Sequence, residues 1–227
     1  MKEQLIQYLS RYITENKKQL IEKVLEERTR YLTVVVEDVY QPHNASAVVR
    51  TCDCYGIQDL HIIENRNKYE VNRDVTLGSS KWVDIIKHNN PGSNNTRDCI
   101  ESLKRKGYKV IATTPHYKDV NLDDLKINHK TALIFGNEKE GLSQEVMEMA
   151  DGFVKIPMVG FTESLNISVS AAVCIHHLIY KLKKSTIDWR LSLEEKQEIK
   201  LSWIRRIIKK SDLLEQEFMN RFQKING

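Results

Sequence analysis

Three polar segments of the chain carry residues that could bind a ligand or take part in a reaction. The first, YQPHNASAVVRT, places Asn44 and Arg50 six positions apart, and a guanidinium can bind phosphate or stabilise an oxyanion. The second, LIFGNEKEGLSQEV, contains Gly136 and Gly141, which allow the backbone to approach a ligand closely. The third, VKIPMVGFTESLNISVSAAV, contains Ser164, which could cap a following helix and leave amide groups free for binding.

Each segment also has an ordinary structural interpretation. A helix that begins near Asn44 would make this residue an N-cap and leave Arg50 on the surface. About one and two-thirds helical turns separate the two residues, so they meet only if Asn44 lies at the helix entry. Each glycine segment alone is compatible with a simple turn between a strand and a helix. Three polar segments in similar positions favour a ligand site, although their spacing does not name the reaction.

The segments lie between elements of an expected α/β fold. Short, nearly continuous apolar runs alternate with helix-like segments, which is typical of a parallel sheet covered by helices on both faces. The six expected strands are Thr33–Val39, Leu60–Ile63, Val83–Ile86, Val110–Thr113, Ala132–Phe135 and Phe153–Ile156. The expected helices between and after them are Ala45–Tyr55, Thr96–Lys106, Ser143–Ala150 and Ile167–Leu182. The fingerprint G-x-G-x-x-G does not follow the first strand, so a ligand must bind at the later strand ends.

Amphipathic helical extensions are expected at both ends. The first extension covers residues 1–30 with an interruption near Asn16, the central domain covers 31–185, and the last extension covers 186–227. Residues 186–190 are the expected linker, and a basic amphipathic segment runs from Leu191 to Phe222. Net charge is +2 in residues 1–30, −3 in 31–180 and +5 in 181–227. Basic ends on a near-neutral core suit a polyanion such as RNA, but solvated helices explain them equally well.

Composition excludes several other classes of protein. Hydrophobic residues make up 41% and charged residues 29%, which excludes wholesale disorder and fits a globular domain with polar helical appendages. The charged N-terminal stretch has no apolar signal core and no segment is long enough to span a bilayer, so we expect a cytoplasmic protein. The cysteine spacing fits neither a disulfide framework nor a four-thiolate zinc site, so we expect free thiols and no metal: Cys52, Cys54, Cys99 and Cys174.

Taken together and in order, the three segments resemble the motifs of the SpoU/TrmH family of SPOUT methyltransferases. The resemblance extends over residues 33–182 and includes PHN-x-SA…RT, G-x-EK-x-G and IPM-x-G…SLN. It implies an S-adenosylmethionine-dependent methyltransferase that modifies an RNA ribose 2'-hydroxyl, foremost that of guanosine 18 in the tRNA D loop. Ribosomal RNA or another tRNA position is the main alternative, and a non-catalytic RNA-binding protein of the same fold is the other.

The resemblance also implies a structure and a site. The carboxyl-terminal part of the sheet would be tied into a trefoil knot, and the protein would be a homodimer whose site uses both chains. The implied cofactor pocket is formed by Thr113, Gly136, Ile156, Ser164 and Leu165. The implied catalytic set is Asn44, Arg50, Glu138, Ser164 and Asn166.

Two roles remain open for Arg50. The family's proposed base matches this residue, yet a guanidinium stays protonated in proteins, so a phosphate clamp or oxyanion stabiliser is an equal alternative. His43 is a rival base because imidazole titrates near neutral pH, but next to Pro42 it reads more simply as a loop histidine. His176 and His177 are interpreted as packing or interface residues.

RNA contacts are expected from the basic tail as well as from Arg50. In the tail, Trp203 either stacks on a base or anchors its helix, and we favour the anchor. The expected phosphate-binding residues are Arg50, Arg205, Arg206, Lys209 and Lys210.

Overall fold

The computed structural model describes residues 1–115 and 120–226, with side chains through Arg221. The chain forms two compact units. The sheet unit is Thr29–Trp189, and the terminal unit combines Met1–Arg28 with the residues from Arg190 onward. Gly227, the last residue of the expected C-terminal extension, lies outside the described residues.

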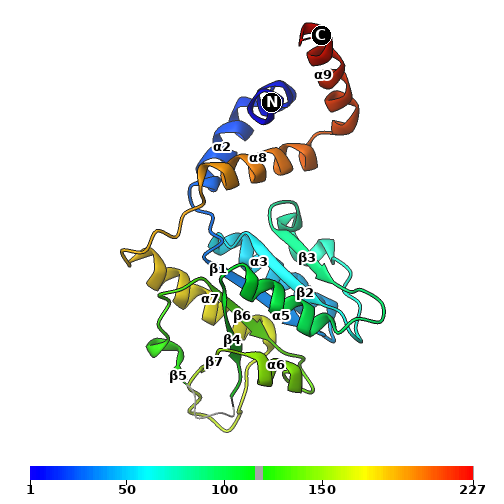
Figure 1. Ribbon diagram of the computed structural model, residues 1–227. Helices are drawn as coiled ribbons and strands as arrows, with labels where there is room; N and C mark the ends of the chain where they lie inside the picture. Colours follow the sequence, from blue (N-terminus) through cyan, green and yellow to red (C-terminus); the bar gives the residue numbers. More distant parts are fainter. Residues whose placement is uncertain (116–119, 227) are drawn as a thin grey trace. The chain divides into compact units, whose positions relative to one another are not determined.

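The sheet unit contains a seven-stranded parallel sheet in the order β3-β2-β1-β6-β4-β7-β5 (Figure 1). The strands are β1 Leu32–Glu37, β2 Asp59–Ile63, β3 Asp84–His88, β4 Lys109–Thr113, β5 Val120–Asn121, β6 Thr131–Phe135 and β7 Gly152–Lys155. The expected α/β class with a parallel sheet is therefore confirmed. Sequence reasoning missed β5, because two residues are too short to form an apolar run.

Helices cover both faces of the sheet. One face packs on α3 (Pro42–Tyr55) and α7 (Ile167–Lys183), and the other packs on α5 (Asn95–Arg105) and α6 (Gln144–Met149). The short elements are α4 (Arg73–Thr76), η2 (Ser79–Lys81) and η3 (Leu122–Asp124). The sheet is thus sandwiched between two helical layers, and ligand access is left to its strand ends.

The central strand β1 shows why the sheet is stable. Its side chains alternate in direction, so Val34 and Val36 join the core under α3 and α7, whereas Val35 joins the core under α5 and α6. All three are fully buried. Burial of a valine side chain contributes about 1.5–3 kcal/mol before entropy is counted. Both helical layers are therefore anchored on the same strand.

The strand order reverses beside β1. From β1 the chain passes outward to β2 and β3, then returns to the other side of β1 through β4 and β6. In open α/β sheets, ligands bind beyond the carboxyl ends of strands at such a reversal. The polar segments after β1, β6 and β7 begin at these ends.

The terminal unit is helical. Its elements are α1 (Lys2–Leu9), η1 (Ser10–Tyr12), α2 (Glu15–Leu25), α8 (Leu193–Ile207) and α9 (Ser211–Asn226). The N-terminal and C-terminal helices pack on each other, for example through the Tyr8 and Phe218 rings, whose centroids are 5.4 Å apart. Lys196 of α8 also pairs with Glu26 at 2.7 Å. The two ends of the chain thus form one structure rather than two separate appendages.

The C-terminal segment differs from the single amphipathic stretch that the sequence suggested. It divides after Ile207, and Lys210 adopts a left-handed backbone conformation with φ +61° at the turn before α9. Lysine rarely adopts this conformation, so the turn gives no signal of the Gly or Asn type. Among the described residues, no helix combines the length and apolar character that a membrane span requires.

Candidate functional site

A cavity of about 640 Å³ lies at the carboxyl ends of β4 and β6. Its volume falls in the range of small-molecule sites. Three segments far apart in sequence wall it: the end of β4 from Thr113, the loop that runs from Gly136 to Leu142, and the entry to α7 around Ser164 and Leu165. The wall combines hydroxyl, carboxylate and aliphatic groups, and can therefore contact polar and apolar parts of one ligand.

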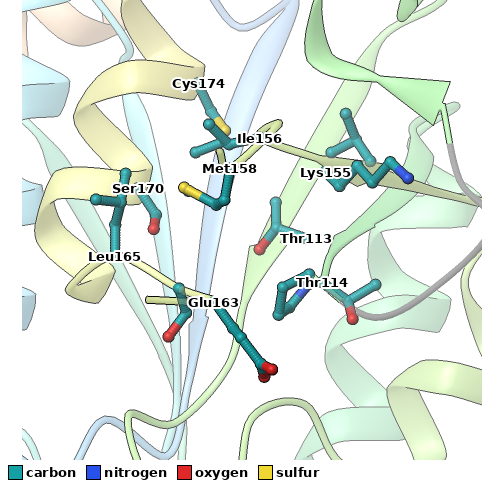
Figure 2. A pocket seen from close by; sticks show the side chains of 12 residues that line it. Thr113, Thr114, Lys155, Ile156, Met158, Glu163, Leu165, Ser170 and Cys174 are labelled. Carbon is teal, nitrogen blue, oxygen red and sulfur yellow. The ribbon is translucent and has the colours of Figure 1, made fainter. Parts of the chain in front are cut away.

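A smaller space of about 70 Å³ adjoins the first and shares Thr113, Ser164 and Leu165 with it (Figure 2). Ile156 and Met158, from the segment after β7, lie on one side, and Cys174 of α7 adds a further apolar surface. The structure thus places all five expected pocket residues around two adjoining cavities: Thr113, Gly136, Ile156, Ser164 and Leu165.

The loop after β6 has a tight shape that requires glycine. The amides of Asn137 and Gly141 donate to each other's carbonyls at 2.8 and 2.9 Å, so the loop folds back on itself. A Cβ at Gly136 would lie only 2.3 Å from the carbonyl carbon of Gly141, and Gly141 has φ +73°. Both glycines are therefore dictated by this backbone path, which carries Glu138 at its tip.

Asn44 is buried in the first turn of α3, and the prediction that it caps the helix is wrong. The helix already begins at Pro42, whose fixed φ suits a first position, and Gln41 occupies the N-cap. The Asn44 side chain faces inward instead. Its Nδ2 donates to Glu138 Oε1 at 2.6 Å, and its Oδ1 accepts from Asn166 Nδ2 at 3.3 Å.

Asn166, not Ser164, caps α7, so this second capping prediction is also wrong. Asn166 Oδ1 accepts from the Ser168 amide at 2.8 Å and from the Ser168 hydroxyl at 2.6 Å. Ser164 lies two residues before the cap and lines both cavities. One asparagine thus ends the loop, starts the helix and reaches Asn44, which is 122 positions away.

Glu138 is held as a carboxylate acceptor. Partial burial by itself would raise its pKa, but hydrogen bonds from Asn44 Nδ2 and from the Tyr40 amide at 2.9 Å outweigh burial and hold the pKa below its usual value. An ionised Glu138 orients the Asn44 amide and contributes negative charge at the cavity. It cannot serve as a proton donor near neutral pH.

Arg50 lies apart from this hydrogen-bonded group. It is exposed on α3, and it lines neither cavity. Within the part of the chain that the structure describes, its guanidinium makes no hydrogen bond or ion pair. The structure thus brings together Asn44, Glu138, Ser164 and Asn166, but leaves Arg50 with its donors available.

The rival histidines and the cysteines occupy unremarkable positions. His43 is exposed on the first turn of α3. The His176 ring packs against the Tyr55 ring, with centroids 5.5 Å apart, and His177 Nδ1 lies 3.5 Å from a carboxylate oxygen of Asp123. All four cysteines are free, as expected.

One cluster in the described residues offers ligand types suited to a metal ion: His61, His88 and Cys99, with ligand atoms within 4.8 Å of one another. His61 Nδ1 and His88 Nε2 lie 2.9 Å apart, a hydrogen-bond distance, whereas two nitrogens on one zinc would be separated by about 3.3 Å. Burial, together with the neighbouring His88, lowers the pKa of His61 to about 3. Burial also lowers the pKa of His88, so the pair is neutral. We interpret it as a structural hydrogen bond.

Sequence reasoning missed several residues at the cavities or next to them, and three of these are informative: Tyr40, Met158 and Glu163. Tyr40 contributes its backbone amide to Glu138, which no side-chain pattern can reveal. Met158 and Glu163 line the smaller cavity from the segment before α7 (Figure 2). Their signal was their position within the third polar segment, from which only Ile156, Ser164, Leu165 and Asn166 were assigned.

The expected RNA-binding residues of the tail lie in the terminal unit and are exposed: Arg205, Arg206, Lys209 and Lys210. Arg205 makes a two-point contact with Glu215 of α9 at 2.6 and 2.7 Å, so part of its role is to join α8 to α9. Trp203 is buried, with the Arg28 guanidinium 5.2 Å from the centre of its ring. This burial confirms that Trp203 anchors its helix and excludes it as a stacking platform.

Comparison with known proteins agrees with this geometry. Residues 31–176 match the model of the SpoU rRNA Methylase family. A tRNA (guanosine(18)-2'-O)-methyltransferase of Borreliella burgdorferi is 46% identical over 91% of this chain and 93% of its own. The enzyme of the same name from Thermus thermophilus is 35% identical over 85% and 98%. The crystal structure of the A. aeolicus TrmH/SpoU tRNA modifying enzyme has a TM-score of 0.76 at 34% identity, over 86% and 98%. The chain belongs to the SpoU rRNA methylase family.

Proposed function

We propose that the protein transfers a methyl group from S-adenosylmethionine to the ribose 2'-hydroxyl of guanosine 18 in tRNA. The observation that carries this proposal is the hydrogen-bonded group Asn166, Asn44 and Glu138, of which Asn166 and Glu138 line a ligand-sized cavity. Relatives named for this reaction cover nearly the whole chain. The protein is an RNA methyltransferase, and guanosine 18 is the substrate that these relatives support.

The cavity residues fit the cofactor. Gly136 and Gly141 have no side chain, so at these positions only backbone atoms form the cavity wall. Thr113 and Ser164 offer hydroxyl oxygens to polar groups of the ligand. Leu165 provides an aliphatic surface for a flat base. When bound, S-adenosylmethionine supplies a methyl group on a positively charged sulfur. We assign its binding to the five residues already named, with Ile156 contributing from the adjoining space: Thr113, Gly136, Ile156, Ser164 and Leu165.

The transfer requires that a ribose hydroxyl lose its proton, which passes to solvent water, while its oxygen attacks in line. Glu138 and Asn166 hold both polar atoms of the Asn44 side chain, so this side chain is already oriented when the substrate binds. Arg50 has a free planar fork of donors, which suits a phosphate or a developing alkoxide. We assign Arg50 to the stabilisation of the attacking oxygen, while Ser164 and Asn166 shape the entry.

The test is methyl transfer to defined RNA. Purified protein, tritiated S-adenosylmethionine and tRNA transcripts should yield labelled RNA, and the label should be lost when guanosine 18 is replaced. In the wild-type transcript, the phosphodiester bond on the 3' side of guanosine 18 should resist alkaline hydrolysis, because its 2'-hydroxyl is methylated. Label that persists in the substituted transcript would contradict the assignment of the position. Absence of transfer to any RNA, together with absence of cofactor binding by calorimetry, would contradict the enzyme itself.

One alternative position has a specific basis. A solved structure whose title describes 2-OH methylation of C/U34 on tRNA aligns with 68% of this chain at 26% identity and a TM-score of 0.57. Its lower similarity and shorter coverage place it behind guanosine 18. The substituted transcripts described above separate the two positions directly.

We also propose that the protein works as a symmetric homodimer, with a site completed by both chains. The support is a row of exposed apolar side chains on α7, at Val169, Val173 and Tyr180, which are 46, 38 and 57% exposed. An isologous dimer would cover such a row with the same row of its partner. Light scattering at micromolar concentration should give twice the chain mass.

Two further parts of the proposal come from the family resemblance. The chain after β6 forms a trefoil knot, in which the segments around Gly136 and Ser164 wall one cavity. The protein acts in the cytoplasm, where its tRNA substrate is found. A crystallographic backbone trace checks the first statement, and cell fractionation checks the second.

A further inference from the structure

Glu37, the last residue of β1, carries a buried carboxylate that the proposed reaction does not use. Glu37 is only 2% exposed. Three donors surround it: the Ser143 amide at 2.9 Å, the Ser143 hydroxyl at 2.7 Å and the Thr96 hydroxyl at 2.7 Å. A buried carboxylate is tolerated only where such donors compensate for its lost hydration. Two of the three hydrogen bonds come from Ser143, so Glu37 fixes where Ser143 lies.

Ser143 ends the loop that begins at Gly136, and its hydroxyl also caps α6 through the Val146 amide. The start of the same loop is tied to the next residue after Glu37, because Asn137 Nδ2 donates to the Asp38 carbonyl at 2.5 Å. Both ends of the loop are thus attached to two consecutive residues of the chain.

This attachment has consequences at the cavity. Gly136 and Leu142 of the loop wall it, and Glu138 of the loop orients Asn44. A shift of Ser143 would move the wall and the carboxylate together. Positioning errors near 1 Å can cost about a hundredfold in rate even when no reacting group is changed.

We propose that Glu37 is a positioning residue for methyl transfer, which acts through Ser143 to hold the cofactor loop in its binding shape. The proposal rests on the proposed function. It assigns to Glu37 no contact with cofactor or RNA. Its effect is transmitted through the loop from Gly136 to Ser143.

Thr96 supplies a matched control. It lies on α5, lines neither cavity, and donates to the same Glu37 oxygen as the Ser143 hydroxyl. Thr96→Val removes one hydrogen bond from the buried carboxylate, and also the acceptor of Asn65 Nδ2 at 2.9 Å, but it changes no residue of the loop. A general loss of core stability would affect Thr96→Val and Glu37→Gln alike, whereas loss of loop positioning would affect only Glu37→Gln.

The experiment measures S-adenosylmethionine affinity by calorimetry, steady-state kinetics with tRNA and thermal unfolding for wild type, Glu37→Gln and Thr96→Val. In Glu37→Gln, one carboxylate oxygen becomes an NH2 group. This group is itself a donor, so it faces the donors of Ser143 or Thr96 and cannot accept from them. We expect cofactor affinity and kcat each to fall by about tenfold, with KM for tRNA changed by less than about twofold. Thr96→Val should lose thermal stability but bind cofactor as wild type does. Wild-type affinity and kcat in Glu37→Gln, or an equal loss of affinity in Thr96→Val, would overturn the proposal.

A second pair of variants keeps the proposal testable if Glu37→Gln does not fold. Ser143→Thr retains the hydroxyl and the cap and should keep cofactor affinity, whereas Ser143→Ala should lose it. Equal affinity in both would overturn the proposal. Calorimetric affinity is independent of which nucleotide is methylated. A wild type that binds cofactor but leaves guanosine 18 unmodified therefore refutes the proposed substrate and not the role of Glu37.

Discussion

At the scale of the residue, Asn44 shows how the site is organised before any substrate arrives. Its amide group is held on one side by an ionised carboxylate, Glu138, and on the other by Asn166. The three residues come from three separate segments, so each restrains the other two. Among the described residues, the Arg50 guanidinium makes no hydrogen bond or ion pair, and the role proposed for it at the substrate oxygen depends on these donors.

Arg50→Ala should separate catalysis from cofactor binding. Arg50 lines neither cavity, so S-adenosylmethionine affinity should stay near the wild-type value. The single-turnover methylation rate should fall by about a hundredfold or more, the scale for loss of one charge-stabilising or proton-transferring group. Arg50→Lys should rescue poorly, because a point charge does not reproduce a planar fork. A wild-type rate in Arg50→Ala would remove Arg50 from the catalytic set.

Gly136→Ala should weaken cofactor binding by changing the backbone path of the loop. The new Cβ would lie within about 2.5 Å of the Gly141 and Leu142 backbone, so the loop must open. We expect calorimetry to show a loss of affinity of at least about tenfold. Gly152→Ala is the control, since its Cβ meets only the flexible Ile111 Cδ1 at 3.3 Å. Similar affinities in the two variants would show that the loop shape does not matter.

At the scale of the element, the sheet and its helices could be predicted because each repeats a local pattern. The strand from Leu32 to Glu37 is a β-branched run buried on both faces, and no tertiary contact is needed to recognise it. The exact ends of the helices were harder to predict from the sequence. Pro42 starts α3 earlier than expected, and Asn166 rather than Ser164 caps α7, because several residues near each end have capping chemistry.

The site and the terminal unit depend on contacts that no local pattern contains. Asn44 and Asn166 meet across 122 positions, and Tyr8 meets Phe218 across almost the whole chain. The family resemblance supplied the first pairing indirectly, through motifs that occur together. The family resemblance gave no information on the contact between Tyr8 and Phe218, because helical spacing shows that a helix face is apolar but not which helix covers it.

The stability of the folded protein should depend on pH because of His61, which lies on β2 beside His88 of β3. Its pKa is lowered to about 3 in the folded protein, while an unfolded histidine titrates near pH 6.5. Between these values the unfolded chain binds a proton that the native protein refuses. Stability is therefore present above about pH 6.5 and falls as the pH decreases, by up to about 1.4 kcal/mol per pH unit.

Urea unfolding at pH 7.5 and 5.5 checks this expectation. His61→Leu should be less sensitive to the pH change than wild type, because the site can no longer exclude a proton. His43→Leu is the matched control, since His43 is exposed and should leave the pH dependence unchanged. If His61→Leu loses as much stability as wild type on acidification, His61 is not the neutral buried histidine described above.

At the scale of the whole molecule, the net charge resides in one unit. The terminal unit has 15 Lys and Arg against 11 Asp and Glu, a net charge of +4, whereas the sheet unit has 20 against 20. The methyl-transfer site is thus built on an electrically balanced unit, and the excess positive charge is carried by the terminal helices. This division suggests that one unit performs the reaction and the other increases the affinity for the RNA backbone.

The division predicts that neutral substitutions in the terminal unit weaken RNA binding without slowing the chemistry. Lys209→Gln with Lys210→Gln removes two exposed charges and spares Arg205, whose pairing with Glu215 supports the helices. Each lost phosphate contact should lower the slope of log affinity against log salt by about 1, while the single-turnover rate at saturating RNA stays unchanged. Filter binding across a salt series measures the first quantity, and rapid-quench methylation measures the second. The same charge removed from the sheet unit, by Lys109→Gln with Lys126→Gln, should leave the slope as it is. If both double variants change the slope equally, RNA is held by diffuse charge over the whole molecule and the terminal unit has no special part in substrate binding.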